Sequence, residues 1–475
     1  MSVDPKTVIT FGTDGWRGVI ADTFTFENVR IVVQAIADYI LQKNPHPDGI
    51  VIGYDNRFQG EHFARIAAEV LTGNGIPVFP SHTSFPTPLI SFATKQYGLD
   101  GGIMITASHN PPEYSGVKFK MPAGCSADPE TTKAFESLLC QTPVRGRDLT
   151  DAEANGLVHH IKLERPYREW LKNFIDYKTL NRKPYTIIVD SMYGVGKRYV
   201  EELLKGTCHT VITIRGERNP AFPGISPEPV PKNMDATVAA LLQAGADLAL
   251  VTDGDADRLA ALDSRGDYII TPKIAVLIAM HLIKNRGWSG SMVKTISCSV
   301  IVDRFAREHG LKLVEEPVGF KYIVPYLLNN EALVGTEESG GLGIQNHIPE
   351  RDGILGSLMF LEALIGLDFS NAADAMDYID SQFGCMRYHR IDHEISPAQK
   401  ATFLARVEAS PPKELLGKKI VRIKDFDGVK FECDDDSWLL LRFSGTEPVV
   451  RFYAEGPSSD QARELTEIGL AMLND

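Results

Sequence analysis

Residues 106–120 read TASHNPPEYSGVKFK, and the rest of the chain is organised around this stretch. It follows an apolar run, Gly102 to Ile105, that predicts a buried strand ending just before Ser108. The proline pair Pro111-Pro112 predicts a sharp turn, because proline cannot continue a strand ladder. Open α/β folds place their chemistry at the carboxyl ends of strands, so Ser108 is a candidate nucleophile. The alternative is a turn in which Ser108 and its neighbours only satisfy local backbone groups.

The flanking sequence alternates between short apolar runs and segments with helical spacing. Before Ser108, strands are expected near 50–52, 76–79 and 103–108, with helices near 26–41, 61–71 and 89–96. Similar alternations run over 186–251 and 273–364, without a residue-level repeat that would prove duplication. This pattern predicts βαβ units around mainly parallel sheets. After about residue 384 the order changes to a smaller α+β arrangement.

Length and composition bound the class of protein. A chain of 475 residues predicts roughly three domains, and 43% hydrophobic and 23% charged residues are typical of a globular protein. The net charge of -13 argues against nucleic acid as a partner, although a local basic cluster could still bind a small anion. The six scattered cysteines form no C-x-x-C pair, so neither a zinc site nor a disulfide framework is expected. No signal peptide and no apolar stretch of about 18 residues is visible, so we expect a cytoplasmic protein without a membrane partner.

A second candidate site is Asp253-Gly254-Asp255-Ala256-Asp257-Arg258, which follows a predicted strand. Three carboxylates at alternate positions can converge on one cation if the loop curls, and hard oxygen ligands select Mg²⁺ or Ca²⁺. An EF-hand would need glycine at the sixth and glutamate at the twelfth position, where Arg258 and Ser264 stand. A solvated acidic turn is the other alternative, and the mutual repulsion of three close carboxylates disfavours it.

Two further segments carry polar side chains after predicted strands. Gly335 to Gly341, GTEESGG, offers carboxylates and a hydroxyl that suit sugar hydroxyl groups, or else a helix N-cap. Arg442 to Pro448, RFSGTEP, together with Arg451 could hold a phosphate, or else form a hairpin turn with exposed arginines. Gly194-Val195-Gly196 hints at dinucleotide binding, but Tyr199 stands where that fingerprint needs its third glycine.

Taken in order, TASHNPPEYSGVKFK, DGDADR, GTEESGG and RFSGTEP resemble the four active-site motifs of the α-D-phosphohexomutases, which include phosphoglucomutase and phosphomannomutase. FGTDGWRG (residues 11–18) and EEPVGFKY (residues 315–322) also match family elements. The resemblance implies three α/β domains with mixed sheets and a smaller α+β C-terminal domain, heart-shaped around a central cleft. We expect the domains at 1–155, 156–265, 266–380 and 381–475.

The resemblance also assigns roles to individual residues. Ser108 would carry a phosphoryl group, and Asp253, Asp255 and Asp257 would hold Mg²⁺ together with an oxygen of the phosphoserine. Lys118 would be a proton shuttle, provided that nearby cations lower its pKa. His109 and Arg17 would position phosphate and substrate, and Arg258 would bind phosphate. Glu337 and Ser339 would bind the sugar, and Lys321 would contact the substrate. The distal phosphate would be bound by Arg442, Ser444, Gly445, Thr446 and Arg451.

Three positions depart from the family pattern. Gly341 stands where the bacterial dual-specificity mannose/glucose enzymes commonly have histidine, so the sugar loop looks more like the glucose type. Arg351 replaces a lysine of the P-E-K-D-G element, and it is expected to be a phosphate ligand because arginine does not readily exchange a proton. Ser115 stands where asparagine or glycine is usual.

The implied activity is interconversion of glucose 1-phosphate and glucose 6-phosphate through phosphoserine and a 1,6-bisphosphate. Mg²⁺ would be the cofactor, glucose 1,6-bisphosphate the activator, and the protein a monomer or homodimer. Within this chemistry, mannose phosphate, glucosamine phosphate and a glucose 1,6-bisphosphate synthase remain alternatives. A non-catalytic sugar-phosphate-binding regulator is the alternative from another class, and the intact Ser108 and aspartate triad disfavour it.

Overall fold

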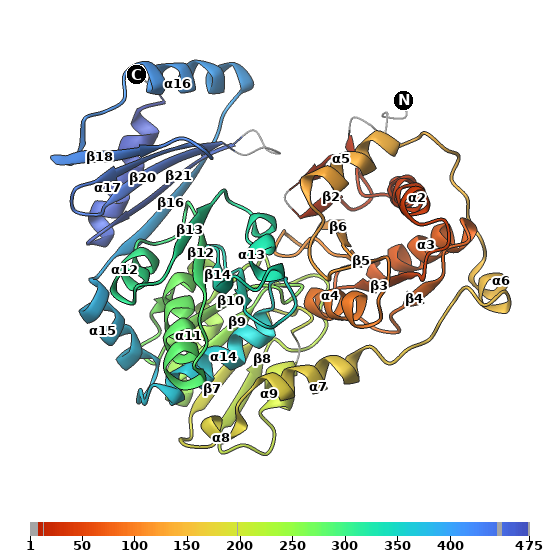
Figure 1. The fold of residues 1–475 in the computed structure, drawn as a ribbon, viewed down its shortest axis with the longest axis horizontal. Coiled ribbons are helices and arrows are strands. Elements are labelled where there is room, and N and C mark those ends of the chain that lie inside the picture. Colours follow the sequence, from red (N-terminus) through yellow and green to blue (C-terminus); the bar gives the residue numbers. More distant parts are fainter. Residues whose placement is uncertain (1–7, 13, 197, 444–448, 474–475) are drawn as a thin grey trace.

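The computed structural model describes residues 8–12, 14–196, 198–443 and 449–473. Four sheets follow one another along the chain. In Figure 1 the first lies at the right, in red and orange, and the last, in blue, lies at the upper left. The second and third lie between them. The expected class of three α/β units and an α+β C-terminal unit is confirmed.

The first sheet contains the strand that leads to Ser108. Its strands lie in the order β1-β2-β6-β5-β3-β4. Their bounds are β1 Phe11–Gly12, β2 Gly15–Val19, β3 Ile50–Tyr54, β4 Val78–Pro80, β5 Gly101–Ile105 and β6 Tyr114–Lys120. The helices of this part are α2 Phe26–Lys43, α3 Gly60–Gly73, α4 Thr87–Gln96, α5 Pro129–Leu138 and α6 Leu149–Ala154.

The second sheet has the order β11-β10-β9-β7-β8. Its strands are β7 Thr186–Asp190, β8 Thr210–Ile214, β9 Leu248–Thr252, β10 Leu259–Asp263 and β11 Tyr268–Ile269. The helices around it are α7 Glu164–Phe174, α8 Tyr177–Leu180, α9 Tyr199–Leu203, η1 Pro231–Asn233 and α10 Asp235–Ala244.

The third sheet has the order β13-β12-β14-β15. Its strands are β12 Ser291–Thr295, β13 Leu313–Glu316, β14 Ala332–Thr336 and β15 Leu342–Ile344. The helices are α11 Thr271–Arg286, α12 Ile301–Glu308, η2 Phe320–Tyr322, α13 Val324–Leu328, α14 Gly353–Gly366 and α15 Ala372–Phe383. All residues of α14 are buried, and this helix contacts α11 of its own unit and α8, α9, β9 and β10 of the second unit.

These three sheets share one topology. In each, three parallel strands are followed by a fourth that runs antiparallel to the third: β4-β3-β5-β6, β8-β7-β9-β10 and β13-β12-β14-β15. The mixed sheets implied by the resemblance are confirmed, and in each sheet an antiparallel strand follows the candidate loop. The three candidate loops occupy the same place, because each joins the third strand to the fourth.

The C-terminal sheet is antiparallel, in the order β16-β21-β20-β19-β18-β17. Its strands are β16 Arg387–Glu394, β17 Glu414–Leu415, β18 Lys418–Lys424, β19 Val429–Cys433, β20 Trp438–Phe443 and β21 Val449–Gly456, and its helices are α16 Pro397–Ala409 and α17 Ser459–Ala471. It packs on the third unit through an apolar cluster that contains Ile296 and Trp438. Glu455 adds a polar contact, because its carboxylate accepts hydrogen bonds from the Val300 N–H and the Trp438 indole, both at 2.9 Å.

No helix in the described ranges is long and apolar enough to cross a membrane.

Ser115 gives a test of the packing in the first unit. Its hydroxyl is fully buried and has no hydrogen-bond partner among the described residues. Ser126 is the matched control, because its hydroxyl lies 2.9 Å from Lys120 Nζ and 2.7 Å from Glu350 Oε2. Burying an unpaired hydroxyl costs about 1 kcal/mol or more. We expect Ser115→Ala to raise the free energy of unfolding, measured by urea titration, and Ser126→Ala to lower it. A loss of stability in Ser115→Ala would contradict this packing.

Candidate active site

Two of the candidate loops meet at Ser108. The Ser108 hydroxyl donates a hydrogen bond to Asp253 Oδ2 at 2.7 Å, although the two residues lie on different sheets and are 145 positions apart. Ser108 is only 1% exposed. Its backbone has φ +52°, a left-handed conformation that costs a non-glycine residue on the order of 1 kcal/mol. Other residues of the chain share this conformation, so it is the hydrogen bond to Asp253 that disfavours an ordinary turn.

The third loop approaches the same place. Arg258, at the end of the aspartate loop, donates to the backbone oxygen of Ser339 at 3.4 Å. Leu259 N–H donates to Gly340 O at 3.0 Å. The loop of residues 335–341 joins β14 to β15, so its interpretation as a helix N-cap is wrong.

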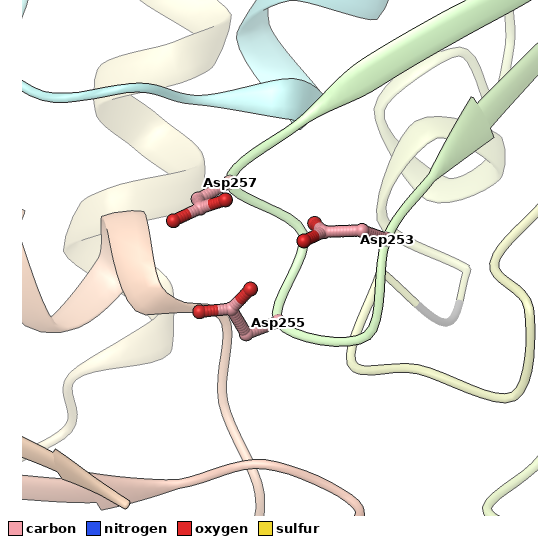
Figure 2. Close-up of side chains that lie close together, drawn as sticks. All are labelled: Asp253, Asp255 and Asp257. Atoms are coloured by element: carbon pink, nitrogen blue, oxygen red, sulfur yellow. The ribbon is translucent and has the colours of Figure 1, made fainter. Parts of the chain in front are cut away.

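The aspartate triad forms a cluster that suits a hard cation. Figure 2 shows the three side chains turned toward one another around a common space. One carboxylate oxygen of each lies within 4.8 Å of the others, and all three residues are buried. Oδ1 of Asp255 and Oδ1 of Asp257 have no hydrogen-bond partner among the described residues. Ala256, with φ +58°, lets the loop curl as predicted. Buried carboxylate oxygens without donors fit Mg²⁺, which prefers oxygen ligands.

The charges of the triad are unequal. Burial raises the pKa of Asp253 well above its usual value, and repulsion from Asp255 and Asp257 adds to the rise. Burial also opposes ionisation of Asp255, but the Lys118 ammonium and the Thr87 hydroxyl outweigh it and lower the pKa of Asp255. The protonated form is therefore favoured at Asp253 and disfavoured at Asp255.

Lys118 lies among carboxylates. Its Nζ is 2.8 Å from Asp14 Oδ2, 2.8 Å from Asp255 Oδ2 and 3.0 Å from Asp257 Oδ2. Burial alone would lower the pKa of Lys118, but these three carboxylates outweigh burial and raise it above the usual value. The expectation that neighbouring cations lower this pKa is wrong. The residues that face Lys118 favour its ammonium form.

Asp14 and Arg351 complete a network that the sequence did not predict. Arg351 Nη2 donates to Asp14 Oδ2 at 2.5 Å and to Asp257 Oδ2 at 2.8 Å. The structure thus places the Arg351 guanidinium against carboxylates of the first and second units, where a phosphate ligand was expected. Lys120 Nζ donates to Glu350 Oε2 at 2.7 Å, which adds a fully buried pair between the first and third units. The only sequence signal for Asp14 was its place in the family element FGTDGWRG.

His109 and Arg17 lie beside Ser108 on the first unit. His109 Nδ1 is 3.4 Å from Ser108 Oγ. Burial and the charges of Arg258 and Arg17 hold the pKa of His109 well below its usual value, so the imidazole is neutral near pH 7. The Arg17 guanidinium donates to the side-chain oxygen of Asn110 within the Ser108 loop.

Glu337 is the buried acid of the third loop. It is 3% exposed, and its Oε2 lies 3.7 Å from Arg351 Nη1 with no hydrogen-bond partner among the described residues. Burial raises the pKa of Glu337 to about 7. Its neighbour Glu338 differs, because the Ser297 hydroxyl donates to Glu338 Oε2 at 2.6 Å.

The predicted distal phosphate residues lie on or near the C-terminal sheet. Arg442 donates to Asp427 Oδ2 at 2.8 Å and is opposite Arg451 in the pairing of β20 with β21. Lys321 is half-buried, and burial lowers its pKa, with a further lowering by the charge of Arg442. Ser444, Gly445 and Thr446 fall outside the described residues. The flanking strands β20 and β21 pair antiparallel, but Arg442 is buried and Arg451 is only partly exposed, so the exposed arginines of the hairpin alternative are not found.

Gly194-Val195-Gly196 has a packing role. A Cβ on Gly194 would lie 2.7 Å from Gly254 O, and one on Gly196 would lie 2.4 Å from Thr252 Oγ1. Val195 N–H donates to Gly254 O at 3.0 Å. The two glycines therefore let the β7–α9 connection lie directly against the aspartate loop.

Comparisons with known proteins agree along nearly the whole chain. The phosphoglucomutase/phosphomannomutase domain families match in order: alpha/beta/alpha domain I at residues 8–142, domain II at 165–266, domain III at 271–378 and the C-terminal domain at 404–468. A phosphoglucomutase/phosphomannomutase of Thermococcus kodakarensis is 31% identical, with 98% of each chain covered. A probable phosphoglucosamine mutase of Methanosphaera stadtmanae is 28% identical, also with 98% of each covered.

Among solved structures, a protein of Thermus thermophilus provisionally described as a phosphomannomutase superimposes with a TM-score of 0.86. It is 33% identical to this chain, and 100% of each chain is covered.

The raised pKa of Asp253 favours a bound proton on this carboxylate, which gives a test of the metal site. Because a cation at the triad would compete with this proton, we expect Mg²⁺ binding to the chelator-treated protein to release protons and to tighten as pH rises. Calorimetric titrations in two buffers of different ionisation enthalpy measure the release. Asp255→Asn is expected to weaken binding at least about 10-fold, because it removes a ligand. Asp263→Asn, at a buried aspartate paired with Arg265 at 2.8 Å, is the control and should bind normally. Mg²⁺ binding that releases no protons would contradict the raised pKa described for Asp253.

The raised pKa of Glu337 predicts a pH-dependent stability. Because the folded pKa of about 7 exceeds the ordinary value of 4.5, folding takes up a proton between these pH values, and stability falls as pH rises through this window. We expect Glu337→Gln to be more stable than the wild type by on the order of 2 kcal/mol above the window, and the difference to vanish below it.

Urea unfolding at a series of pH values, with chelator present, measures this difference. Glu338→Gln is the control, because it replaces a carboxylate that already accepts the Ser297 hydroxyl. If the difference in free energy of unfolding between Glu337→Gln and the wild type does not change with pH, the pKa of Glu337 is not raised by burial.

Proposed function

The chain belongs to the phosphoglucomutase/phosphomannomutase family of intramolecular phosphotransferases, and we propose that it moves a phosphoryl group between O1 and O6 of glucose phosphate. The observation that carries the proposal is the hydrogen bond of 2.7 Å between the Ser108 hydroxyl and Asp253, one of three clustered aspartates. This contact supports the proposal of a phosphoryl carrier beside a Mg²⁺ site. Phosphoryl transfer depends mainly on such positioning and on charge stabilisation.

In the first half-reaction, the bond between phosphorus and Ser108 Oγ breaks while a bond from phosphorus to a sugar hydroxyl oxygen forms, which gives the 1,6-bisphosphate. After the bisphosphate has turned over, its other phosphoryl group returns to Ser108 Oγ. In the first step the sugar hydroxyl loses its proton and Ser108 Oγ gains one. In the second step Ser108 Oγ loses its proton and the freed sugar oxygen gains one. Lys118 is our candidate for this transfer. Its ammonium form, favoured by Asp14, Asp255 and Asp257, suits the second step.

Asp253, Asp255 and Asp257 would hold Mg²⁺ together with an oxygen of phosphorylated Ser108. A cation there would withdraw charge from the transferring phosphoryl group. Arg258 is placed to bind the same group, since its Nε lies 4.0 Å from Asp253 Oδ2 and 3.9 Å from Asp257 Oδ1. His109, held neutral, could donate or accept one hydrogen bond without adding charge.

The sugar and the distal phosphate would bind on the third and fourth units. Glu337 and Ser339 are proposed for the sugar hydroxyls. Lys321, Arg442 and Arg451 are proposed for the phosphate that does not react, together with Ser444, Gly445 and Thr446. A single distal phosphate site fits a substrate that turns end over end. Arg351 remains a proposed phosphate ligand, and its hydrogen bonds to Asp14 and Asp257 also hold these two carboxylates in place.

Two alternatives concern the same site. The relatives carry names for both glucose/mannose and glucosamine enzymes, so glucosamine phosphate is the second candidate substrate. A glucose 1,6-bisphosphate synthase would use the same carrier but release the bisphosphate. Incubation with glucose 6-phosphate and fructose 1,6-bisphosphate separates the two, because only a synthase accumulates glucose 1,6-bisphosphate.

The proposal is tested by turnover with Mg²⁺ and a trace of glucose 1,6-bisphosphate. We expect glucose 1-phosphate to be converted faster than mannose or glucosamine 1-phosphate. Intact mass should show one phosphoryl group on the active protein. Ser108→Ala should lose at least about 10³-fold in rate, because no other hydroxyl is proposed as carrier. Ser137→Ala, on the exposed face of α5, is the control and should retain full activity. Full activity in Ser108→Ala would rule out this mechanism.

A further inference from the structure

Arg57 lies behind the Ser108 loop and has no part in the reaction described above. It follows β3, in the segment that connects this strand to α3, and its side chain is fully buried. Its guanidinium donates to four backbone oxygens of one loop. Nη2 donates to Ser108 O at 2.8 Å and to Asn110 O at 2.6 Å, and Nη1 donates to Pro111 O at 2.7 Å and to Tyr114 O at 2.9 Å.

The same loop is held from its other end by a second buried chain of contacts. Asp55 Oδ2 lies 3.2 Å from Arg57 Nε and accepts a hydrogen bond from the Thr106 hydroxyl at 2.5 Å. Thr106 Oγ1 in turn accepts the Ser108 N–H at 2.8 Å. Two hydrogen bonds therefore hold the Ser108 backbone. Its N–H is bound to Asp55 through Thr106, and its carbonyl oxygen is bound directly by Arg57.

Residues of the second unit also contact this pair and its neighbour Asn56. The Phe222 ring lies 5.3 Å from the Arg57 guanidinium carbon and is itself fully buried. Asn56 Nδ2 donates to Tyr193 O at 2.8 Å and to Gly194 O at 2.9 Å, next to the aspartate loop. Residues 55–57 thus contact both the loop that carries Ser108 and the connection that supports the metal-binding loop.

We propose that Arg57 is a positioning residue for phosphoryl transfer. It holds Ser108 in its left-handed conformation, with Oγ directed at Asp253, by donating to four carbonyl oxygens between residues 108 and 114. It touches no reacting atom, so it acts through the backbone of the loop. A guanidinium suits this task, because its planar donors can serve several carbonyl oxygens at fixed angles, whereas an ammonium has three donors around one atom.

The proposal rests on the phosphotransferase function proposed above, and a purely structural role is its rival. A residue that only stabilises the fold would lower the amount of active protein without altering its kinetic parameters. A positioning residue alters kcat while leaving sugar-phosphate binding in place, because Glu337, Lys321 and Arg442 lie on other units. Misplacement of a reacting group by about 1 Å can cost on the order of 100-fold in rate.

Arg57→Lys is the test, and Arg215→Lys is the matched control. The Arg215 side chain is 10% exposed, pairs with an aspartate, Asp190, and donates to a backbone oxygen, Asn233 O, but these contacts lie within the second unit. We expect Arg57→Lys to lower kcat at least about 10-fold with KM changed by less than about 3-fold. Arg215→Lys should change neither parameter per folded molecule.

A readout that is independent of activity accompanies the kinetics. Hydrogen exchange, followed by mass spectrometry, should speed up in peptides that cover residues 106–114 of Arg57→Lys and stay unchanged in peptides from the C-terminal sheet. If Arg57→Lys does not fold, Phe222→Leu, which removes the ring beside the guanidinium, should give a smaller change of both readouts in the same direction.

Unchanged kcat, or equal losses in Arg57→Lys and Arg215→Lys, would overturn the positioning role. If the wild type has no mutase activity, the proposed function fails, and the exchange measurement still tests whether Arg57 holds the loop.

Discussion

The structure depends on the neutralisation of buried carboxylates by cations from other parts of the chain. Asp14, Asp255 and Asp257 surround one ammonium, Lys118, and Arg351 joins two of these carboxylates from the third unit. Burying a charge without a partner costs several kcal/mol. The cations of one unit therefore stabilise the carboxylate loops of another. Within the triad, Asp255 Oδ1 and Asp257 Oδ1 have no hydrogen-bond partner among the described residues, and an added cation would complete the charge balance there.

The shared topology of the first three sheets explains why the candidate loops converge. Each loop leaves the third strand and returns as an antiparallel fourth strand, so Ser108, the aspartates and Glu337 occupy equivalent places on three sheets. The buried helix α14 and a continuous apolar core then bring the sheets together. The C-terminal sheet has its own core and contacts the third unit through Trp438 and Glu455.

The sequence predicted the residues of the site better than the contacts among them. Ser108 and the aspartates were found because their loops follow clear strands, and the helix over residues 26–41 was found from its spacing. The strand β6 was missed because Lys118 and Lys120, buried by ion pairs, interrupt an apolar pattern. Asp14, Glu350 and Arg57 were missed because their partners are far away in the sequence, and the lowered pKa expected for Lys118 failed for the same reason.

The central claim is that Ser108 passes its phosphoryl group to the sugar and receives another in return. A single-turnover measurement tests it directly. Protein loaded on Ser108 from ³²P-labelled glucose 1,6-bisphosphate is mixed with unlabelled glucose 1-phosphate, and the label is followed by rapid quench. We predict that it leaves Ser108 and appears first in the bisphosphate and then in glucose 6-phosphate, while Ser108 stays phosphorylated. Label that remains on Ser108 during turnover, or that appears only as inorganic phosphate, would contradict the account.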